Sequence, residues 1–503
     1  MSGSWHQALD FNRAARNVHL EFTGDWYRDP WSWPEIAWVV AGDHALLLDR
    51  LEADGVHRVA KLEVPKENFG TRPAVVIPPL DRLVYQSLVD VASRSLIDGL
   101  PWWAYGWRLP RTAHEAGDYS PNSTEWRLYR NSLSQLAGRY SCGLVTDVVS
   151  FFASIPTERI CEDAAATAGG RIGSRLAAML RGWSEIPGRS GLPQRSSASA
   201  VLANRYLRPL DDTLEAISRR AAPSAKGATC LRWMDDVWIF GSDRGELRRG
   251  QVEIEGVVRD LGLDLGSGKT KVLEGASLVE AARSIEHSAV DVGLEEAPVD
   301  LEPLHTLLSR IALDPESAPH SSIRFAARRI RDKKLWREAD PLIRVAWQMP
   351  HGADHIGRLL RDSGKWQGLT DWYLDYVSSP WGCFDWSIGQ LGGMFPGSGE
   401  IPGAITQYFA SVIPQHRELP LAAFAAHRLA AWRPNEARPV LRDAAKAAAD
   451  PLERRCLVLA LLQAGERRPL VRALLAEFPE NRVTLRMLED RGYRPLPVAA
   501  DYV

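Results

Sequence analysis

The sequence has few cysteines, and none of them is spaced as zinc ligands usually are. Its 503 residues include five cysteines without a C-x-x-C pair: Cys142, Cys161, Cys230, Cys383 and Cys456. No uninterrupted apolar run is long enough to span a bilayer, and the first residues, MSGSWHQALDF, lack the basic and apolar regions of a signal peptide. These absences argue against zinc-ribbon and disulfide-rich classes and predict a cytoplasmic protein without a membrane partner.

The sequence also lacks an excess of charge of either sign. The formal net charge is −2, with 45% hydrophobic and 25% charged residues, which is the composition of a folded globular protein. A near-neutral total argues against a surface coated in positive charge, but it leaves room for a local basic groove. A chain of this length exceeds one ordinary hydrophobic core, so two or three domains are expected.

The pattern of apolar residues changes near residue 300. Before it, expected strands at 72–78, 143–149 and 231–240 alternate with expected helices at 81–100, 198–217 and 245–263. Residues 115–124 are predicted to form an exposed loop, and residues 291–300 a linker. After the linker, helical spacing with short breaks at Pro or Gly predicts a stacked array of short amphipathic helices.

Two adjacent acids interrupt the apolar stretch RWMDDVWIF. Asp235 and Asp236 can be the exposed tip of a tight hairpin, or half of a metal site that needs a further carboxylate. Asp147, at the end of the apolar run in GLVTDVVSFFASI, is a candidate for that carboxylate, although a lone Asp there also suits a turn or a helix cap. A nucleotidyl transferase holds two divalent cations between such carboxylates.

Other segments carry residues that suit a nucleotide. In RSGLPQRSSASAVLAN, Gln194 stands at a backbone bend and offers both a donor and an acceptor, and Ser196 or Ser197 is placed to cap the following helix. Lys269 lies in LGLDLGSGKTKVLEG, which misses the phosphate-binding loop consensus by one residue and follows a helical segment. We therefore interpret Lys269 as a basic residue after a strand turn.

Two basic segments near the amino end suit phosphates. Lys66 and Arg72, in PKENFGTRP, are placed to clamp a triphosphate; the alternative is a pair of solvated charges at a hairpin tip. Arg108 and Arg111 stand beside Trp107 in YGWRLPR, a combination suited to backbone phosphates and base stacking.

Taken in order, these segments resemble a reverse transcriptase. The motifs are PKENFGTRP with IPPLDRLV, then YGWR, DVVSFFASI, GLPQRSSASAVLAN, RWMDD and LDLGSGKT, spanning about residues 65 to 275. The resemblance implies an α+β right-hand polymerase fold, with fingers and a palm of antiparallel strands backed by helices. It implies an RNA-directed DNA polymerase that uses two Mg²⁺ ions, with Mn²⁺ as an alternative, and dNTPs as substrates.

The resemblance also implies roles for individual residues. Asp147, Asp235 and Asp236 match the metal-binding carboxylates, and Lys269 matches a lysine proposed to assist pyrophosphate departure. Further matches concern the incoming nucleotide: Phe152 matches the aromatic that disfavours a 2'-hydroxyl, Gln194 packs against the nucleotide, and Lys66 and Arg72 contact its phosphates.

Four positions depart from the family pattern. Trp233 replaces the usual Tyr before the acidic pair, Met234 replaces a small residue, and Arg195 replaces the Gly that follows Pro-Gln. Gly266 stands where an Asn is common. Trp233 and Arg195 are therefore expected to contact the primer or template, and ordinary processive copying is not implied.

The part after residue 300 resembles the helical-repeat region of bacterial abortive-infection and defence-associated reverse transcriptases. The local hints are RFAARRIRDKKLW at 324–336 and DWYRDPW at 25–31. In that group a helical array replaces the thumb, oligomers are common, and some members extend DNA without a template from a protein hydroxyl. The candidates for such priming are Tyr373, Tyr376 and Tyr408, with a role in the hydrophobic core as the alternative for each.

The expected organisation has three parts: an N-terminal helical or fingers extension at 1–64, fingers and palm at 65–290, and an α-helical repeat domain at 301–503. The expected function is DNA synthesis in antiphage defence, with a DNA or RNA template or a non-coding RNA as partner. Two alternatives stay open. One is a nucleic-acid-binding scaffold with a degenerate polymerase site, and the other is a retron- or intron-type enzyme that copies a dedicated RNA.

Overall fold

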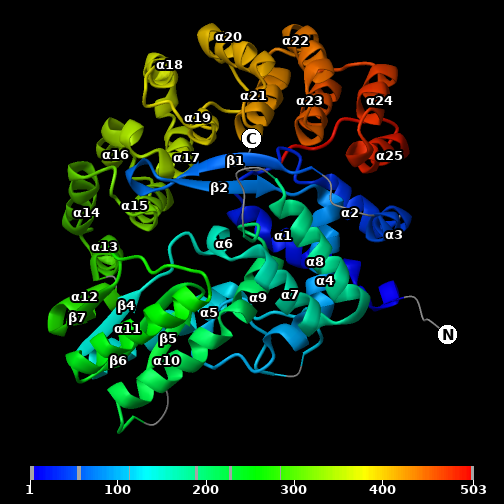
Figure 1. Cartoon of the computed structure of the whole chain (residues 1–503). Coiled ribbons are helices and arrows are strands. Elements are labelled where there is room, and N and C mark those ends of the chain that lie inside the picture. The colour runs from blue at the N-terminus through cyan, green and yellow to red at the C-terminus, as the bar shows by residue number, and fades with distance from the viewer. Residues whose placement is uncertain are drawn as a thin grey trace. The chain divides into compact units, whose positions relative to one another are not determined.

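The chain forms two compact units, each assembled from separate stretches of sequence (Figure 1). The computed structural model describes residues 5–42, 44–53, 58–112, 114–186, 191–225, 229–283 and 285–499. The first unit comprises residues 1–21, 48–56 and 81–288, and the second comprises residues 22–47, 57–80 and 289–503. The late boundary lies near the expected change at residue 300. The grouping of 22–47 and 57–80 with the helical part was not predicted.

The first unit contains a five-stranded sheet with the strand order β3-β5-β6-β4-β7. Its strands are β3 (Ala104–Tyr105), β4 (Cys142–Thr146), β5 (Cys230–Trp233), β6 (Asp236–Gly241) and β7 (Lys271–Glu274). All neighbouring pairs are antiparallel except β3 with β5. An antiparallel sheet was expected, and the predicted strand at 231–240 forms both arms of the β5–β6 hairpin.

Helices cover both faces of this sheet. In the central strand β6, four consecutive residues, Val237 to Phe240, are buried, although successive side chains of a strand point to opposite faces. The helices that pack on the sheet are α5 (Asn122–Arg139), α10 (Arg208–Ala221), α11 (Arg244–Asp260) and α12 (Gly275–Arg283). The helix predicted at 198–217 is two helices, because α9 (Ser197–Tyr206) ends before Leu207, which leaves the helical conformation, and Pro209 stands in the first turn of α10.

The remaining helices of the first unit are α1 (Phe11–Glu21), α6 (Phe151–Ser154), α7 (Thr157–Ala168) and α8 (Gly170–Ser184). Three further helices, α3 (His44–Glu52), α4 (Pro79–Ile97) and α13 (Ile285–Glu295), run from one unit into the other. Helix α13 occupies the first half of the predicted linker at 291–300, so that half of the prediction was wrong.

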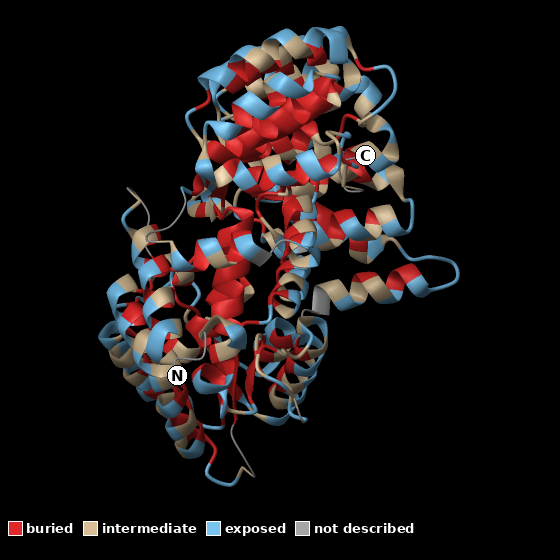
Figure 2. Ribbon diagram, turned by 90° about the vertical axis from the view of Figure 1, so that its right-hand side faces the viewer, coloured by how far each residue is buried: buried red, intermediate tan, exposed pale blue. Residues whose placement is uncertain are grey.

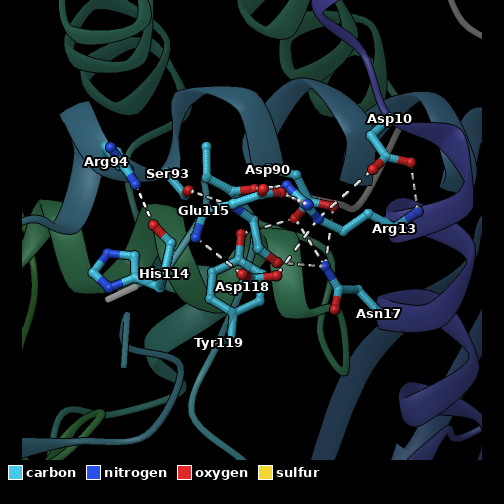
Figure 3. Close-up of polar contacts among 12 residues, drawn as sticks. Asp10, Arg13, Asn17, Asp90, Ser93, Arg94, His114, Glu115, Asp118 and Tyr119 are labelled. Atoms are coloured by element: carbon cyan, nitrogen blue, oxygen red, sulfur yellow. Dashed lines mark hydrogen bonds and ion pairs between the residues drawn. The ribbon is translucent and has the colours of Figure 1, made fainter. Parts of the chain in front are cut away.

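A polar network ties the loop after β3 to α1 and α4 (Figure 3). The buried Asp90 accepts hydrogen bonds from Gln86 (2.7 Å), Tyr119 (2.9 Å) and Asn17 (3.0 Å). Gly117 lies so close that a Cβ there would stand 2.7 Å from the Cβ of Asp90. The prediction of an exposed loop at 115–124 was therefore wrong in two respects, because Gly117 is buried and α5 already begins at Asn122.

The second unit combines a β-hairpin with a long series of helices (Figure 1). Strands β1 (Ala60–Pro65) and β2 (Thr71–Val76) pair antiparallel, and α2 (Pro34–Ala41) precedes them. The helical series comprises α14 (Glu302–Leu313), α15 (His320–Asp332), α16 (Asp340–Val345), α17 (Ala353–Ser363), α18 (Thr370–Ser378), α19 (Asp385–Gly392), α20 (Gly403–Val412), α21 (Leu419–Trp432), α22 (Pro434–Ala447), α23 (Pro451–Gln463), α24 (Arg468–Ala476) and α25 (Arg482–Asp490).

Two of these helices are buried almost along their whole length rather than on one face. Residues 419–430 of α21 and 451–462 of α23 are all buried, and Figure 2 shows continuous buried ribbon within the helical layers. The prediction of amphipathic helices was wrong for this pair. The buried Arg455 of α23 is neutralised by Asp29 (2.8 Å) and Glu35 (2.6 Å), as a charge inside a protein requires. No described helix is long and apolar enough to cross a membrane.

Candidate active site

The acidic pair sits at the tight turn between β5 and β6. Trp233 and Asp236 are the last paired residues, so Met234 and Asp235 form a two-residue loop. Met234 has a φ of +54°, as the first loop residue does in a type II′ turn, where glycine is preferred. A side chain in this region costs on the order of 1–3 kcal/mol. The predicted hairpin tip therefore exists, and it presents its acids in a strained, well-defined geometry.

The third acid is brought to this turn by strand register. Strand β4 pairs with β6 so that Thr146 lies opposite Val237. Because the two strands are antiparallel, Asp147, which directly follows β4, leaves the sheet beside Asp236. The loop after α11 fastens the backbone at this point, since Gly266 N donates to the carbonyl of Asp147 at 2.9 Å. Residues far apart in sequence thus meet at one end of two neighbouring strands.

Lys269 contacts this cluster directly. Its Nζ lies 2.5 Å from Asp147 Oδ2, while Asp147 Oδ1 is buried without a hydrogen-bond partner in the described structure. Burial lowers the pKa of Lys269, but the hydrogen bond to Asp147 and the charges of Asp147, Asp236 and Asp235 outweigh it, so the pKa is raised. The ammonium group therefore stays charged and offsets part of the negative charge.

One lysine does not neutralise three acids. Burial, followed by the charge of Asp236, raises the pKa of Asp235 to about 7. Exclusion of water and the charge of Asp147 raise the pKa of Asp236 to about 6, although this residue keeps solvent contact. Acids whose ionised forms repel one another are relieved by a divalent cation, and carboxylate oxygens are the ligands that Mg²⁺ prefers.

The residues therefore fit a divalent cation in ligand type and charge, and the buried Asp147 Oδ1 offers an uncommitted ligand atom. The three carboxylates do not surround a single point closely, because no choice of one oxygen from each places all three within 4.8 Å of one another. Lys269 occupies the other oxygen of Asp147.

A buried ion pair contacts the backbone of the turn. Arg232 on β5 is fully buried and donates to both carboxylate oxygens of Asp211, at 2.7 and 2.9 Å. The same guanidinium donates to Asn204 Oδ1 (2.9 Å) and to the carbonyl of Met234 (3.2 Å). Arg232 thus links the strained turn to α9 and α10. The sequence reasoning missed this role, although a charge inside an apolar strand was the available signal.

Comparison with protein families identifies the segment in which this cluster lies. Residues 64–299 match the family model of reverse transcriptase (RNA-dependent DNA polymerase). This segment is a reverse transcriptase domain. The match indicates an RNA-directed DNA polymerase, a nucleotidyltransferase, and it spans the segments that carry all the predicted motifs. No curated protein matches the chain.

Within the reverse transcriptase domain, the structure brings Phe152 and the loop before Gln194 together. Leu192 N donates to the carbonyl of Phe152 at 2.8 Å. Gly191 has a φ of +68°, and a Cβ there would stand 2.0 Å from the same carbonyl, so only glycine fits. Ser196 caps α9, as one of the two predicted options. Gln194 is half-buried, and the neighbouring Arg195 is exposed with a φ of +59°.

An aromatic cluster surrounds Trp233. Its ring centroid lies 4.9 Å from Trp126, 5.8 Å from Tyr129 and 6.0 Å from Trp107. A Cβ at Gly106 would meet the indole at an ordinary contact distance of 3.5 Å, so the glycine is favoured by its φ of +79°. Trp126 is 45% exposed, so the cluster continues to the surface next to the acidic turn. The rings are inclined to one another, so it is the exposed Trp126 ring that suits base stacking.

The predicted arginines occupy different environments. Arg108 is buried and donates to the carbonyls of Pro101 (2.9 Å) and Ala104 (2.5 Å), which commits it to holding its own loop. Arg111 is exposed, lies 5.8 Å from the ring centroid of Tyr105 and donates to Glu125 at 3.4 Å. Of the two, only Arg111 presents its side chain at the surface, where it can reach a phosphate.

Lys66 and Arg72 belong to the β1–β2 hairpin of the second unit, whereas the acids belong to the first. Lys66 N donates to the carbonyl of Gly70 at 2.7 Å and closes the hairpin loop. The Arg72 guanidinium lies 5.5 Å from the ring centroid of Trp26. Their contact with nucleotide phosphates stays a prediction.

One further group of described residues could hold a metal ion, and the sequence reasoning did not find it. The ligand atoms of His320, Asp354 and His355, all in the second unit, lie within 4.8 Å of one another. Arg358 donates to Asp354 at 2.9 Å, and this guanidinium opposes a cation at the same carboxylate.

Proposed function

We propose that the reverse transcriptase domain is a Mg²⁺-dependent DNA polymerase that adds dNTPs to a 3'-hydroxyl by two-metal catalysis. The observation that carries the proposal is the convergence of Asp147, Asp235 and Asp236 at the ends of two paired strands, with Lys269 in contact with Asp147. Carboxylates that raise one another's pKa are what a pair of dications requires.

In this proposal the three aspartates hold Mg²⁺, or Mn²⁺ in its place. The bound cations would lower the pKa of the attacking 3'-hydroxyl and neutralise the leaving pyrophosphate. Lys269 lies beside the same carboxylates as a charged ammonium group, where it can approach the leaving phosphates and donate a proton to them. Arg232 acts as a positioning residue, because its hydrogen bond to Met234 holds the turn that carries the acidic pair.

Phe152 and Gln194 are proposed to contact the incoming nucleotide. Their proximity through Leu192 supports a shared role, with the Phe152 ring excluding a 2'-hydroxyl and Lys66 and Arg72 contributing from the hairpin. If Phe152 selects deoxynucleotides, Phe152→Ala raises the incorporation of rNTPs relative to dNTPs, by roughly tenfold for a loss of about 1.4 kcal/mol in discrimination. An unchanged ratio would remove Phe152 from this role, and Phe151→Ala is the neighbouring control.

The central experiment is incorporation of labelled dNTPs with an RNA template and DNA primer in Mg²⁺. We expect activity from wild type, none from Asp235→Ala, and unchanged activity from Asp260→Asn, which removes one charge from the exposed end of α11. Equal activity of wild type and Asp235→Ala would refute two-metal catalysis at this turn. No incorporation by wild type with any template, primer or co-purifying RNA would favour the nucleic-acid-binding scaffold.

We further propose a role in antiphage defence, on the resemblance of the helical part to defence-associated reverse transcriptases. Protein priming, if it occurs, has fewer candidates than the sequence left open. Tyr373 and Tyr376 are fully buried, and Tyr373 donates to the carbonyl of Ile388 at 3.0 Å. Tyr408 is half-buried, and burial raises its pKa to about 12. Tyr408 is therefore the candidate to replace by Phe.

Two measurements test these roles. Cells expressing wild type should resist a phage that infects cells expressing Asp235→Ala. Protein digested after denaturation should retain covalent DNA if a side chain is the primer. Sequencing of the co-purifying nucleic acid would distinguish untemplated product from a dedicated RNA of the retron or intron type.

A further inference from the structure

The helical unit contains a pocket whose lining is rich in arginine. It lies where α17, α19 and α21 come together, and these helices pack on one another in sequence order. The charged residues that line it are Arg28, Asp354, Arg358, Arg361 and Arg428. All of them belong to the second unit, and none is part of the proposed polymerase site.

Helix geometry explains why these residues converge. On α17, positions 354, 358 and 361 are four and three residues apart, and on α21 positions 420, 424 and 428 repeat every four. Each set therefore occupies one face of its helix. Between them, α19 contributes Gly389 and Gln390, and Gly393 directly follows α19. The two glycines add no side chain here, and a Cβ at Gly389 would stand 3.4 Å from the carbonyl oxygen of Pro420, so glycine lets α19 approach α21 closely.

The pocket carries more positive than negative charge. Four of the five charged residues that line it are arginines, and the fifth is an aspartate. Arg358 donates to Asp354 at 2.9 Å, and Arg361 donates to Asp362 at 3.2 Å. Asp362 also binds Arg331 at 2.6 Å, so this carboxylate is shared between two arginines.

Much of this charge is removed from water. Arg428 is 1% exposed, and the Arg358 and Arg361 side chains are 23% and 17% exposed. The Arg428 guanidinium lies over the ring of Phe424, 5.3 Å from its centroid, which fixes its plane. Like charges held close together in a poorly solvated pocket repel one another strongly, and an anion that binds between them removes this cost.

We propose that this pocket binds a phosphomonoester, such as the 5'-phosphate of a nucleic acid or of a nucleotide. A phosphomonoester carries about −1.5 to −2 charges near neutral pH and presents three terminal oxygens, which matches a pocket lined by four arginines better than the singly charged phosphodiester does. Planar guanidinium forks bind such oxygens in pairs. A pocket, rather than an open groove, also suits a terminal group.

The test is calorimetric titration in chloride buffer with EDTA, which withholds divalent cations from the polymerase site. The probes are inorganic phosphate, dAMP, and a short single-stranded DNA with either a 5'-phosphate or a 5'-hydroxyl. We expect wild type to bind the 5'-phosphorylated DNA at least about tenfold more tightly than the 5'-hydroxyl form, the scale of a charge-assisted contact. Equal affinities together with no binding of inorganic phosphate or dAMP would overturn the proposal.

Variants assign the effect to the pocket. Arg361→Gln and Arg28→Gln should abolish the preference for the 5'-phosphate, whereas Arg486→Gln, which removes the same charge from an exposed site on α25, should retain it. Asp235→Ala should also retain the preference. Failure of the polymerase proposal and failure of the pocket proposal are therefore distinguishable. Thermal melts of each variant identify misfolding. If the folded Arg361→Gln and Arg28→Gln proteins kept the preference, the phosphate would bind elsewhere and the proposal would be wrong.

The probes also identify the source of the phosphate. Tighter binding of the phosphorylated DNA than of dAMP supports a nucleic-acid end, because neighbouring nucleotides then add contacts. Equal binding of both supports a free nucleotide. Either result supports the phosphomonoester pocket.

Discussion

Replacing Gly266 by alanine tests the geometry of the acidic cluster with the smallest change available. A Cβ at position 266 would stand 2.4 Å from Asp147 Oδ1. Contacts of this kind below 3.0 Å are essentially never observed, so the two atoms must separate by at least about 0.6 Å. The end of a side chain moves more easily than the backbone, and we expect the Asp147 carboxylate to turn away.

The expected consequence is a loss of activity without a loss of stability. A shift of about 1 Å in a catalytic group can cost on the order of 10²-fold in rate, so a shift of about 0.6 Å should lower dNTP incorporation by roughly 10- to 100-fold. Gly266 does not have a positive φ, so alanine can adopt its backbone conformation. The substitution also reduces the backbone entropy of the unfolded chain. The free energy of unfolding should therefore change by less than about 1 kcal/mol.

The assay is single-nucleotide incorporation under single-turnover conditions, paired with a denaturant titration. Gly268→Ala is the matched control, because a Cβ at Gly268 meets nothing within 4 Å. If Gly266→Ala and Gly268→Ala incorporated dNTPs at the same rate, the position of Asp147 Oδ1 would not matter to the reaction. The reasoning about the cluster would then be wrong.

Two further substitutions address the support of the site and the stability of the domain that carries it. Arg232→Met leaves the buried Asp211 without its partner and should lower the free energy of unfolding by about 3–5 kcal/mol; adding Asp211→Leu should restore most of the stability but not the incorporation rate, because the Met234 carbonyl still lacks its donor. Recovery of both together would show that Arg232 acts only on stability. Burial raises the pKa of Asp90 from 3.8 to about 7, so between these pH values the folded state binds a proton that the unfolded chain has released. The stabilisation from this proton is complete below pH about 4 and is lost as the pH rises through about 7. Thermal melts from pH 5 to pH 8 should show this decline, by at most about 1.4 kcal/mol per pH unit, and Asp90→Asn should flatten it; a stability that rose with pH equally in both proteins would contradict this assignment.

Much of the candidate active site was predictable because the chemistry proposed for it depends on residue type and order. Asp147, Asp235 and Asp236 are acids at the ends of apolar strands, and the structure brings them together through the pairing of β4 with β6. The tight turn was also readable, since the acidic pair divides two apolar arms. The left-handed φ of Met234 was not, because nothing in the local sequence requires a non-glycine residue there.

Roles that depend on burial were less predictable. Arg108 is a residue type that often binds phosphates, but its guanidinium donates to backbone carbonyls of its own loop. The helices α21 and α23 contain charged residues that suggested an exposed face. In α23, neighbours in the tertiary structure neutralise such charges, as Asp29 and Glu35 do for Arg455, and periodicity within one segment cannot show a partner more than 400 positions away.

The sequence by itself determined the class of chemistry, because the order of the acidic, glutamine and lysine motifs can be read without knowing the fold. Only the tertiary structure decided how the chain is divided, since residues 22–47 and 57–80 join the helical unit by contacts with residues distant in sequence. The same holds for the arginine-lined pocket. Arg28, Arg358 and Arg428 lie in three unrelated segments, and their charges meet only because the segments between and around them pack together.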